Sequence, residues 1–272
     1  MGAEAARKAL KNAGITAKEI DLILTATITP DMVFPATSAL IQNIIGAKNA
    51  GILDIEAACS GFIYGITIAN QFIKTGEYRN ILVIASEVLS RITDWEDRST
   101  CVLFGDAAGA AVVSESTSES EIIATYLGGD GFYKELLYMP AGGSLYPASE
   151  ETLKNRMHYI KMKGNETFKL AVTKMCESAE IVIKKAGISS EDISLLIPHQ
   201  ANLRIIQAVQ KRLNLTDDKV FVNLQRYGNT SAATIPVALA EAVESGKIKR
   251  GDIVVLVAFG GGFTWGSAVI RW

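Results

Sequence analysis

The sequence has 272 residues, of which 49% are apolar, and a formal net charge of −2 at pH 7. This length and composition allow one large or two medium domains with a sizeable core. The near-neutral charge and the lack of a run of about 18 apolar residues give no signal for nucleic acid or membrane, so we expect neither partner and a cytoplasmic protein.

The first part of the chain alternates helices with buried strands. Residues 3–13 have helical spacing and stop at Gly14, and residues 20–26 are typical of a buried strand. We expect a loop over 29–35, helices over 38–45 and 62–74, and strands over 51–55 and 81–85. Residues 98–114 predict two strands joined by a turn at 105–109, with Cys101 a core residue of the first strand.

The second part of the chain repeats this order. Residues 11–24 align without a gap with residues 184–197, and both read as a helix, a glycine, an acidic turn and a buried strand. A strand over 121–127 precedes the helix over 168–186, whereas no strand precedes the first helix of the chain. We predict two pseudo-symmetric α/β halves, 1–120 and 121–272, with mostly parallel sheets and without the first strand of the first half. The polar, glycine-rich connection over 128–151 is typical of a binding or lid element.

Cys59 stands between the strand over 51–55 and the helix over 62–74. A helix N-terminus can lower the pKa of a cysteine to roughly 3.5–7.5, so this position predicts a nucleophilic thiolate. Its small neighbours leave room for an acyl group. The alternative is a buried structural cysteine. Cys59, Cys101 and Cys176 are far apart and form no CxxC pair, which argues against disulfides and a zinc site.

Three further features favour catalysis. His199 follows a buried strand, Asn229 precedes a helix start, and Gly260, Gly261 and Gly262 separate two apolar strands. Each has a structural alternative: a hydrogen-bonded histidine, an N-cap asparagine and a hairpin turn. Together with Cys59 they suit thioester chemistry. Backbone donors near Cys59 and Gly261 would form an oxyanion hole, each worth about 3–4 kcal/mol, and His199 and Asn229 would stabilise an enolate without a metal.

Five motifs in order make the whole chain resemble the β-ketoacyl-[acyl-carrier-protein] synthase III family of condensing enzymes. They are Glu-Ala-Ala-Cys-Ser-Gly-Phe (56–62), Asp-Trp-Glu-Asp-Arg-Ser-Thr-Cys-Val-Leu-Phe-Gly-Asp (94–106), Pro-His-Gln-Ala-Asn-Leu-Arg-Ile (198–205), Tyr-Gly-Asn-Thr-Ser-Ala-Ala (227–233) and Gly-Gly-Gly-Phe-Thr-Trp-Gly (260–266). The resemblance implies a thiolase-like fold in five αβαβα layers and a homodimer. It also implies an acyltransferase of bacterial fatty-acid biosynthesis that condenses acetyl-CoA, or another short acyl-CoA, with malonyl carrier protein, with no other cofactor and no metal. Cys59 would carry the acyl group, and His199 and Asn229 would hold the malonyl carbonyl.

The resemblance also implies roles for residues outside the catalytic trio. Phe34 matches a residue that closes the partner's acyl pocket, and Arg98 one that contacts the CoA nucleotide. Acyl and CoA contacts are also implied for Gly164, Asn202 and Phe259, and carrier-protein contacts for Lys169, Arg204, Lys211 and Arg212, which could equally form a solvated helix face. Family members have further residues ahead of the position of Ala3, including a tryptophan and an arginine that help to hold CoA.

The sequence leaves alternatives open. Asn229 excludes condensing enzymes with two histidines, and Ala258-Phe259 offers no cysteine of the kind that degradative thiolases use near the final glycine turn. A plant-type polyketide synthase or a hydroxymethylglutaryl-CoA synthase remains possible, although the motif around Arg204 argues against both. The alternative from another class is an inactive scaffold that keeps the carrier-protein surface. The primer acyl group is not fixed by the sequence.

Overall fold

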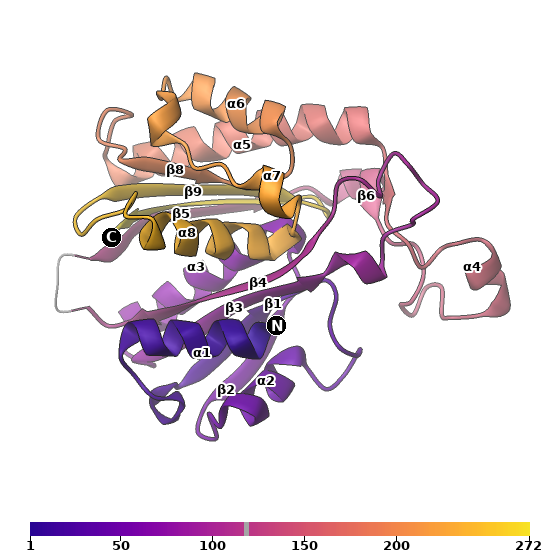
Figure 1. The fold of residues 1–272 in the computed structure, drawn as a ribbon, viewed down its shortest axis with the longest axis horizontal. Helices are drawn as coiled ribbons and strands as arrows, with labels where there is room; N and C mark the ends of the chain where they lie inside the picture. Colours follow the sequence, from indigo (N-terminus) through magenta and orange to yellow (C-terminus); the bar gives the residue numbers. More distant parts are fainter. Residues whose placement is uncertain (117–119) are drawn as a thin grey trace.

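The computed structural model describes residues 1–116 and 120–272, which form two four-stranded sheets and a small two-stranded one (Figure 1). Residues 117–119, beside the expected boundary between the halves, lie outside this description. The first sheet, in the order β2-β1-β3-β4, contains β1 (Leu22–Ala26), β2 (Gly51–Ile55), β3 (Asn80–Val88) and β4 (Asp106–Ser114). The second, in the order β5-β10-β9-β8, contains β5 (Glu121–Gly129), β8 (Leu195–Pro198), β9 (Ile253–Gly260) and β10 (Thr264–Arg271).

The pairing differs between the two large sheets. In the first sheet β1 is parallel to β2 and β3, and only β4 is antiparallel to its neighbour. In the second sheet only β8 and β9 are parallel. The prediction of mostly parallel sheets is therefore wrong for the second sheet. The short connection between β9 and β10 can join only antiparallel strands, and β5 on the other side of β10 is antiparallel to it as well.

The helices complete five layers, αβαβα, as predicted from the resemblance (Figure 1). Helices α1 (Gly2–Ala13) and α2 (Thr37–Ile45) cover the outside of the first sheet, and α5 (Gly164–Ala186) and α6 (Leu203–Arg212) cover the outside of the second. Between the sheets lie α3 (Gly61–Lys74) and α8 (Thr234–Glu244). Within the described parts of the chain, no helix is long and apolar enough to cross a membrane.

The shorter elements lie in the connections between these layers. They are α4 (Glu150–Lys154), α7 (Leu224–Tyr227), the strands β6 (Leu137–Tyr138) and β7 (Lys161–Met162), and the 3₁₀ turns η1 (Ala17–Glu19), η2 (Ala58–Ser60), η3 (Leu89–Arg91), η4 (Gly131–Leu136), η5 (Asp217–Lys219) and η6 (Ser231–Ala233).

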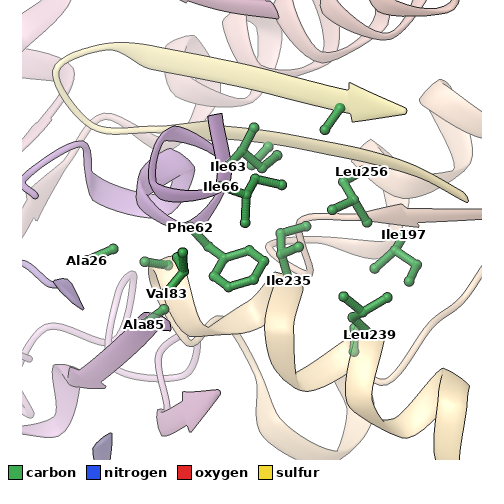
Figure 2. Close-up of a cluster of buried hydrophobic side chains, with 14 of the residues drawn as sticks. Ala26, Phe62, Ile63, Ile66, Val83, Ala85, Ile197, Ile235, Leu239 and Leu256 are labelled. Atoms are coloured by element: carbon green, nitrogen blue, oxygen red, sulfur yellow. The ribbon is translucent and has the colours of Figure 1, made fainter. Parts of the chain in front are cut away.

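The middle layer forms the central core. Phe62, Ile63 and Ile66 of α3 pack with Ile235 and Leu239 of α8, between apolar residues of both sheets (Figure 2). Helices buried on both sides are apolar around most of their circumference, which explains why Phe62 and Ile63 are no more than 1% exposed. Because α3 begins at Gly61, two residues after Cys59, this core holds the cysteine-bearing turn in place.

The aligned stretches of the two halves form the same elements. Helix α1 ends at Ala13 and α5 at Ala186, and each is followed by a glycine with left-handed backbone, Gly14 at φ 69° and Gly187 at φ 70°. Such a glycine ends a helix because it has no Cβ to clash. A buried strand follows in both cases, β1 and β8.

Two predictions for residues 98–114 are wrong. Residues 98–103 form hydrogen-bonded turns in which Asp97 accepts from the backbone N–H of Ser99 (2.9 Å) and the hydroxyl of Thr100 (2.9 Å), so Cys101 lies in a turn and is only half-buried. Of the turn expected at 105–109, residues 106–109 instead form the start of β4. Gly109 sits there because a Cβ would lie 2.8 Å from Pro236 Cβ, so glycine marks a close approach to α8.

Candidate active site

Cys59 lies in η2, in the tight turn between β2 and α3, and the residue is 7% exposed. The turn is compact because Ala58 has left-handed backbone, with φ 43°. Gly61 brings the start of α3 directly onto β1, since a Cβ at Gly61 would lie 2.8 Å from Ala26 Cβ. The sequence therefore places the thiol at the N-terminus of a buried helix, as expected.

The glycine turn of the second half presses against this cysteine. A Cβ on Gly260 would lie only 2.5 Å from the Cys59 backbone nitrogen, so no larger residue fits there. The Thr264 hydroxyl donates to the Ala57 carbonyl (2.8 Å) and ties the start of β10 to the same turn. Gly261, expected at the oxyanion hole, is the next residue, and its Cβ position would be 3.0 Å from the Leu137 carbonyl oxygen. Its oxyanion role stays a prediction.

Asn229 is fixed by its backbone and side chain together. Its N–H donates to Leu103 O (2.9 Å), its carbonyl accepts from Gly105 N (3.0 Å), and its Oδ1 accepts from Ser231 N (2.9 Å). The backbone N–H identifies the side-chain oxygen, so the amide nitrogen Nδ2 remains a donor for another group. The turn that follows, η6, packs against both η2 and β3.

His199 lies directly after β8 and is 2% exposed. Its backbone N–H donates to Val257 O (2.8 Å) on β9, the strand that ends at Gly260. Burial lowers the pKa of His199 to about 4, so the imidazole is neutral at physiological pH. Its Nδ1 is buried and has no hydrogen-bond partner among residues 1–116 and 120–272.

The expected low pKa of Cys59 is wrong. Burial raises the pKa of the thiol to about 12, and the nearby Ser231 hydroxyl opposes this only partly, while the negative charge of Glu87 adds to it. The helix N-terminus does not compensate for the loss of water around the sulfur. Cys59 is therefore a neutral thiol at rest, and a negative charge can form on it only as its proton leaves.

The residues expected to contact the acyl group and CoA are spread over several elements. Phe34, 83% exposed, lies in the loop between β1 and α2, and Arg98 is exposed. Gly164 is the first residue of α5, and Asn202 caps α6 by accepting from Arg204 N (2.8 Å). Phe259 is buried in an outer core, the apolar cluster between the second sheet and helices α5 and α6, with its ring centroid 4.6 Å from that of Phe263. Its side chain therefore lies in the outer core, and a contact with an acyl group stays a prediction.

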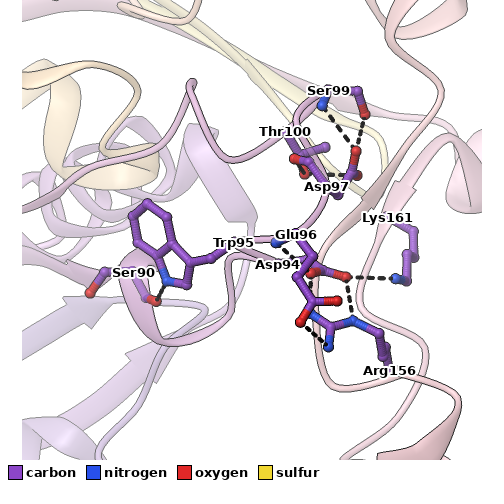
Figure 3. Close-up of polar contacts among 9 residues, drawn as sticks. All are labelled: Ser90, Asp94, Trp95, Glu96, Asp97, Ser99, Thr100, Arg156 and Lys161. Atoms are coloured by element: carbon purple, nitrogen blue, oxygen red, sulfur yellow. Dashed lines mark hydrogen bonds and ion pairs between the residues drawn. The ribbon is translucent and has the colours of Figure 1, made fainter.

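The segment that carries Arg98 is tied to the long connection between β5 and α5 (Figure 3). The side chain of Asp94 is 5% exposed and accepts from Arg156 through both carboxylate oxygens, and Lys161 Nζ lies 3.6 Å from it. Arg156 holds the pKa of Asp94 well below its usual range. These contacts give the exposed Arg98 a fixed base.

The four basic residues expected to contact the carrier protein lie on α5 and α6, and all are exposed. The Arg204 guanidinium stacks 5.0 Å from the Phe168 ring, and Arg212 pairs with Glu180 (2.6 and 3.1 Å). Lys211 lines a groove of about 580 Å³ between these helices, together with Val172, Thr173, Cys176, Glu177, Ala208 and Arg212. Lys169 is the fourth residue of the set. Since Glu180 already neutralises Arg212, the other three offer the freer charges.

Sequence reasoning named the glycine turn but not the close contact of Gly260 with Cys59, and it missed Ser231 and Glu87. Ser231 could have been found from the motif around Asn229. Glu87, 0% exposed at the end of β3, had no signal, because one carboxylate in an apolar strand looks like a surface residue. No group of three or more His, Cys, Asp or Glu side chains in the described ranges could hold a metal ion.

Comparison with known proteins identifies what this arrangement is similar to. Residues 53–131 match the family model 3-oxoacyl-[acyl-carrier-protein] synthase III, and residues 183–272 match the model of its C-terminal part. A β-ketoacyl-[acyl-carrier-protein] synthase III from Caldanaerobacter subterraneus is 55% identical over 100% of this chain and 82% of its own length. The crystal structure of 3-oxoacyl-[acyl-carrier-protein] synthase III from Aquifex aeolicus superposes with a TM-score of 0.92 at 50% identity, covering 100% of this chain and 83% of the other. The priming β-ketosynthase of the R1128 polyketide pathway has a TM-score of 0.91 at 34% identity, covering 99% and 80%.

Proposed function

Because the chain belongs to the β-ketoacyl-[acyl-carrier-protein] synthase III family and is an acyltransferase of fatty-acid biosynthesis, we propose that it joins acetyl, or another short acyl group from CoA, to malonyl carrier protein. The observation that carries this proposal is the position of Cys59. The thiol is buried at the start of α3, between the glycine turn after β9 and the turn that follows Asn229. Both halves of the molecule therefore meet at one nucleophile.

In the first step the Cys59 sulfur attacks the thioester carbonyl of acyl-CoA. The bond from carbonyl carbon to CoA sulfur breaks, the thiol proton leaves with CoA as free CoASH, and an acyl–Cys59 thioester remains. The raised pKa of Cys59 means that deprotonation accompanies attack, and the neutral His199 can relay the proton. The helix N-terminus then favours the charge that forms in the transition state.

In the second step malonyl carrier protein loses CO₂. The electrons of the broken carbon–carbon bond pass to the thioester as an enolate, for which His199 and Asn229 Nδ2 supply two neutral donors. The enolate carbon attacks the acyl–Cys59 carbonyl and forms the 3-oxoacyl carrier protein. The Cys59 thiolate is released and takes up a proton.

Further proposals concern partners and location. The apolar tip of the loop between β1 and α2, with Val33 89% and Phe34 83% exposed, supports a homodimer in which each loop covers the partner's acyl site. Lys169, Arg204 and Lys211 supply positive charge for an acidic carrier protein. We also propose that the enzyme works in the cytoplasm with no cofactor beyond its two substrates. A dimer mass by light scattering would support the homodimer, and full activity in EDTA would support the absence of a metal cofactor.

The decisive test is to incubate the protein with radiolabelled acetyl-CoA, using Cys59→Ala as control, before malonyl carrier protein is added. Label that requires Cys59 and is then discharged as acetoacetyl carrier protein supports the proposal. A folded protein that takes no label from acetyl-CoA or longer acyl-CoAs would instead support the scaffold alternative.

A further inference from the structure

Glu87 is a completely buried carboxylate that the proposed reaction does not use. It lies one residue before the end of β3. Its Oε2 accepts from Ile28 N (3.1 Å), from the Thr29 hydroxyl (2.9 Å) and from the Thr27 hydroxyl (3.4 Å). Three donors from three consecutive residues on one buried oxygen form a specific anchor, because a buried charge is retained only when such donors satisfy it.

These donors begin the segment 27–36, here called the Phe34 loop. The Thr29 hydroxyl oxygen also accepts from Val88 N (2.8 Å), which adds a second link to β3. At the other end of the loop, Asp54 accepts from the N–H groups of Thr37 (2.6 Å) and Ser38 (2.9 Å). The Phe34 loop is therefore clamped by a carboxylate at each end, while its apolar tip is free.

The Glu87 carboxyl group also faces η6, the turn after Asn229. Strand β3 packs against η6, but neither Glu87 Oε1 nor the Ser231 hydroxyl has a hydrogen-bond partner among the described residues. The Ser231 hydroxyl and the Ala232 N–H favour the ionised form of Glu87 and so oppose the rise of its pKa. The same Ser231 hydroxyl also favours the thiolate of Cys59. Ser231 has left-handed backbone, with φ 49°, so this turn holds an uncommon conformation beside the nucleophile.

We propose that Glu87 is a positioning residue that fixes the Phe34 loop to the Asn229–Ser231 turn and thereby sets which acyl groups enter the acyl site that the loop covers, which in the proposed homodimer is that of the partner subunit. The loop needs a rigid base because its tip is exposed and apolar. The turn needs a fixed neighbour because its buried Ser231 hydroxyl has no hydrogen-bond partner among the described residues and favours the charged form of both Glu87 and Cys59. The single Glu87 carboxylate supports both the base of the Phe34 loop and the Asn229–Ser231 turn. The part that concerns acyl groups rests on the proposed function.

The charge of Glu87 affects how readily the Cys59 thiol ionises. Burial raises the pKa of Glu87 to about 7, and its donors oppose that rise. The elements packed against β3 carry further ionisable groups: Glu4, Arg7, Lys8 and Lys11 on α1, Tyr64 and Lys74 on α3, and the exposed Asp106 on β4, which accepts from Ser90. The negative charge of Glu87 itself raises the pKa of Cys59. Removing the charge of Glu87 should therefore make Cys59 easier to ionise.

Two variants separate the effect of the Glu87 charge from the effect of its side-chain length. Glu87→Gln keeps the shape but removes the charge, and should lower the midpoint of the pH profile for alkylation of Cys59 by iodoacetamide by about half a pH unit or more. Glu87→Asp keeps the charge but is one methylene too short to contact both the loop and the turn. It should keep the midpoint and reduce the preference for acetyl-CoA over hexanoyl-CoA in acylation of Cys59 by about tenfold. Glu77→Gln, on an exposed turn after α3, is the matched control and should change neither.

The proposal is wrong unless both changes are seen, because a single change would attach Glu87 to only one of the two elements. Alkylation requires no condensing activity. A wild-type protein that alkylates normally but takes no acyl group therefore rejects the proposed function separately.

If the Glu87 variants do not fold, Thr29→Val and Ser231→Ala test the same link with Glu87 in place. Their combined effect on the preference for acetyl-CoA should differ by threefold or more from the product of the single effects, since groups that share a partner do not act independently. Independent effects would overturn the proposal.

Discussion

Strands β4 and β10 occupy the same place in the two sheets, yet their surroundings differ. Each is antiparallel to the preceding strand, and Gly-Ala-Ala-Val-Val (109–113) corresponds to Gly-Ser-Ala-Val-Ile (266–270). A Cβ at Gly109 would lie 2.8 Å from Pro236 Cβ of α8, and one at Gly266 would lie 3.0 Å from Ile63 Cγ2 of α3. Each glycine thus admits the helix that the other half supplies.

The difference lies at the outer edge. Strand β10 is paired along its other side with β5 and is buried over its central residues, whereas β4 is the last strand of its sheet in the described structure and is mostly half-exposed. The same local sequence is therefore a core strand in one half and a boundary strand in the other. The chemistry is divided as well, with Cys59 from the first half and His199 and Asn229 from the second.

The largest effect should come from Gly260→Ala, where the second half touches the nucleophile of the first. The added methyl group would overlap the Cys59 backbone nitrogen, which cannot move without α3, so acylation of Cys59 should fall by about a hundredfold or more. Gly143→Ala, with open space at its Cβ position, is the control. Wild-type labelling by Gly260→Ala would show that this contact is not needed.

The next largest effect should come from Asn229 of the second half, and it should fall on condensation and not on acylation of Cys59. Asn229→Asp keeps the oxygen that accepts from Ser231 N and removes the Nδ2 donor. Condensation should fall by about 10²–10³, while acylation of Cys59 stays within a few fold, as single-turnover assays of each step would show. Asn12→Asp, on the exposed face of α1, serves as the control. Equal losses in both steps would argue against a role limited to the malonyl carbonyl.

The third prediction contrasts a buried group of each half over the same pH range. The lowered pKa of His199 makes its contribution to stability fall as the pH drops from about 6.5 to about 4, because the unfolded state binds the proton more tightly. The raised pKa of Glu87 has the opposite sign: its contribution falls as the pH rises from about 4.5 to about 7. Each term is on the order of 3 kcal/mol.

The stability contributions of His199 and Glu87 have opposite pH dependences in the wild type. Replacing one of the two residues should leave the pH dependence of the other visible. Melting temperatures between pH 4 and 8 should rise with pH more steeply in Glu87→Gln and less steeply in His199→Gln than in the wild type. Parallel curves for all three proteins would contradict both pKa shifts.

The smallest effect is a difference in unfolding free energy between matched substitutions in β4 and β10. Val269 of β10 is fully buried, and Val269→Ala should lower the free energy of unfolding by about 2 kcal/mol. Val112→Ala removes the same methyl groups from the half-exposed β4 and should cost less than half as much. Urea titrations measure both. Equal costs would mean that β4 is covered as completely as β10 in solution.

Much of the fold could be predicted from the sequence, because its signals are local. The glycine stops at Gly14 and Gly187 fixed the ends of two helices, and apolar runs marked the central strands. The prediction failed where a residue acts through distant contacts. Gly109 was interpreted as part of a turn because nothing nearby in the chain shows that Pro236 packs on it.

The candidate site shows the same limit. Cys59, His199 and Asn229 could be chosen from their motifs, but the pKa of Cys59 depends on how completely α3, β9 and η6 exclude water, which no local pattern reports. Glu87 is separated from the Phe34 loop by about sixty residues, since it contacts Ile28 and Thr29 at sequence separations of 59 and 58.

The contact between Gly260 and Cys59 also has a stereochemical consequence. The backbone of β9 lies against the backbone of Cys59 and closes that side of the turn, so we expect a thioester to approach the sulfur in one fixed orientation. Attack on only one face of a planar carbonyl gives a tetrahedral carbon of a single handedness. We expect inhibitors with a stereocentre at that carbon to be discriminated by configuration, even where both forms have the same size and charge.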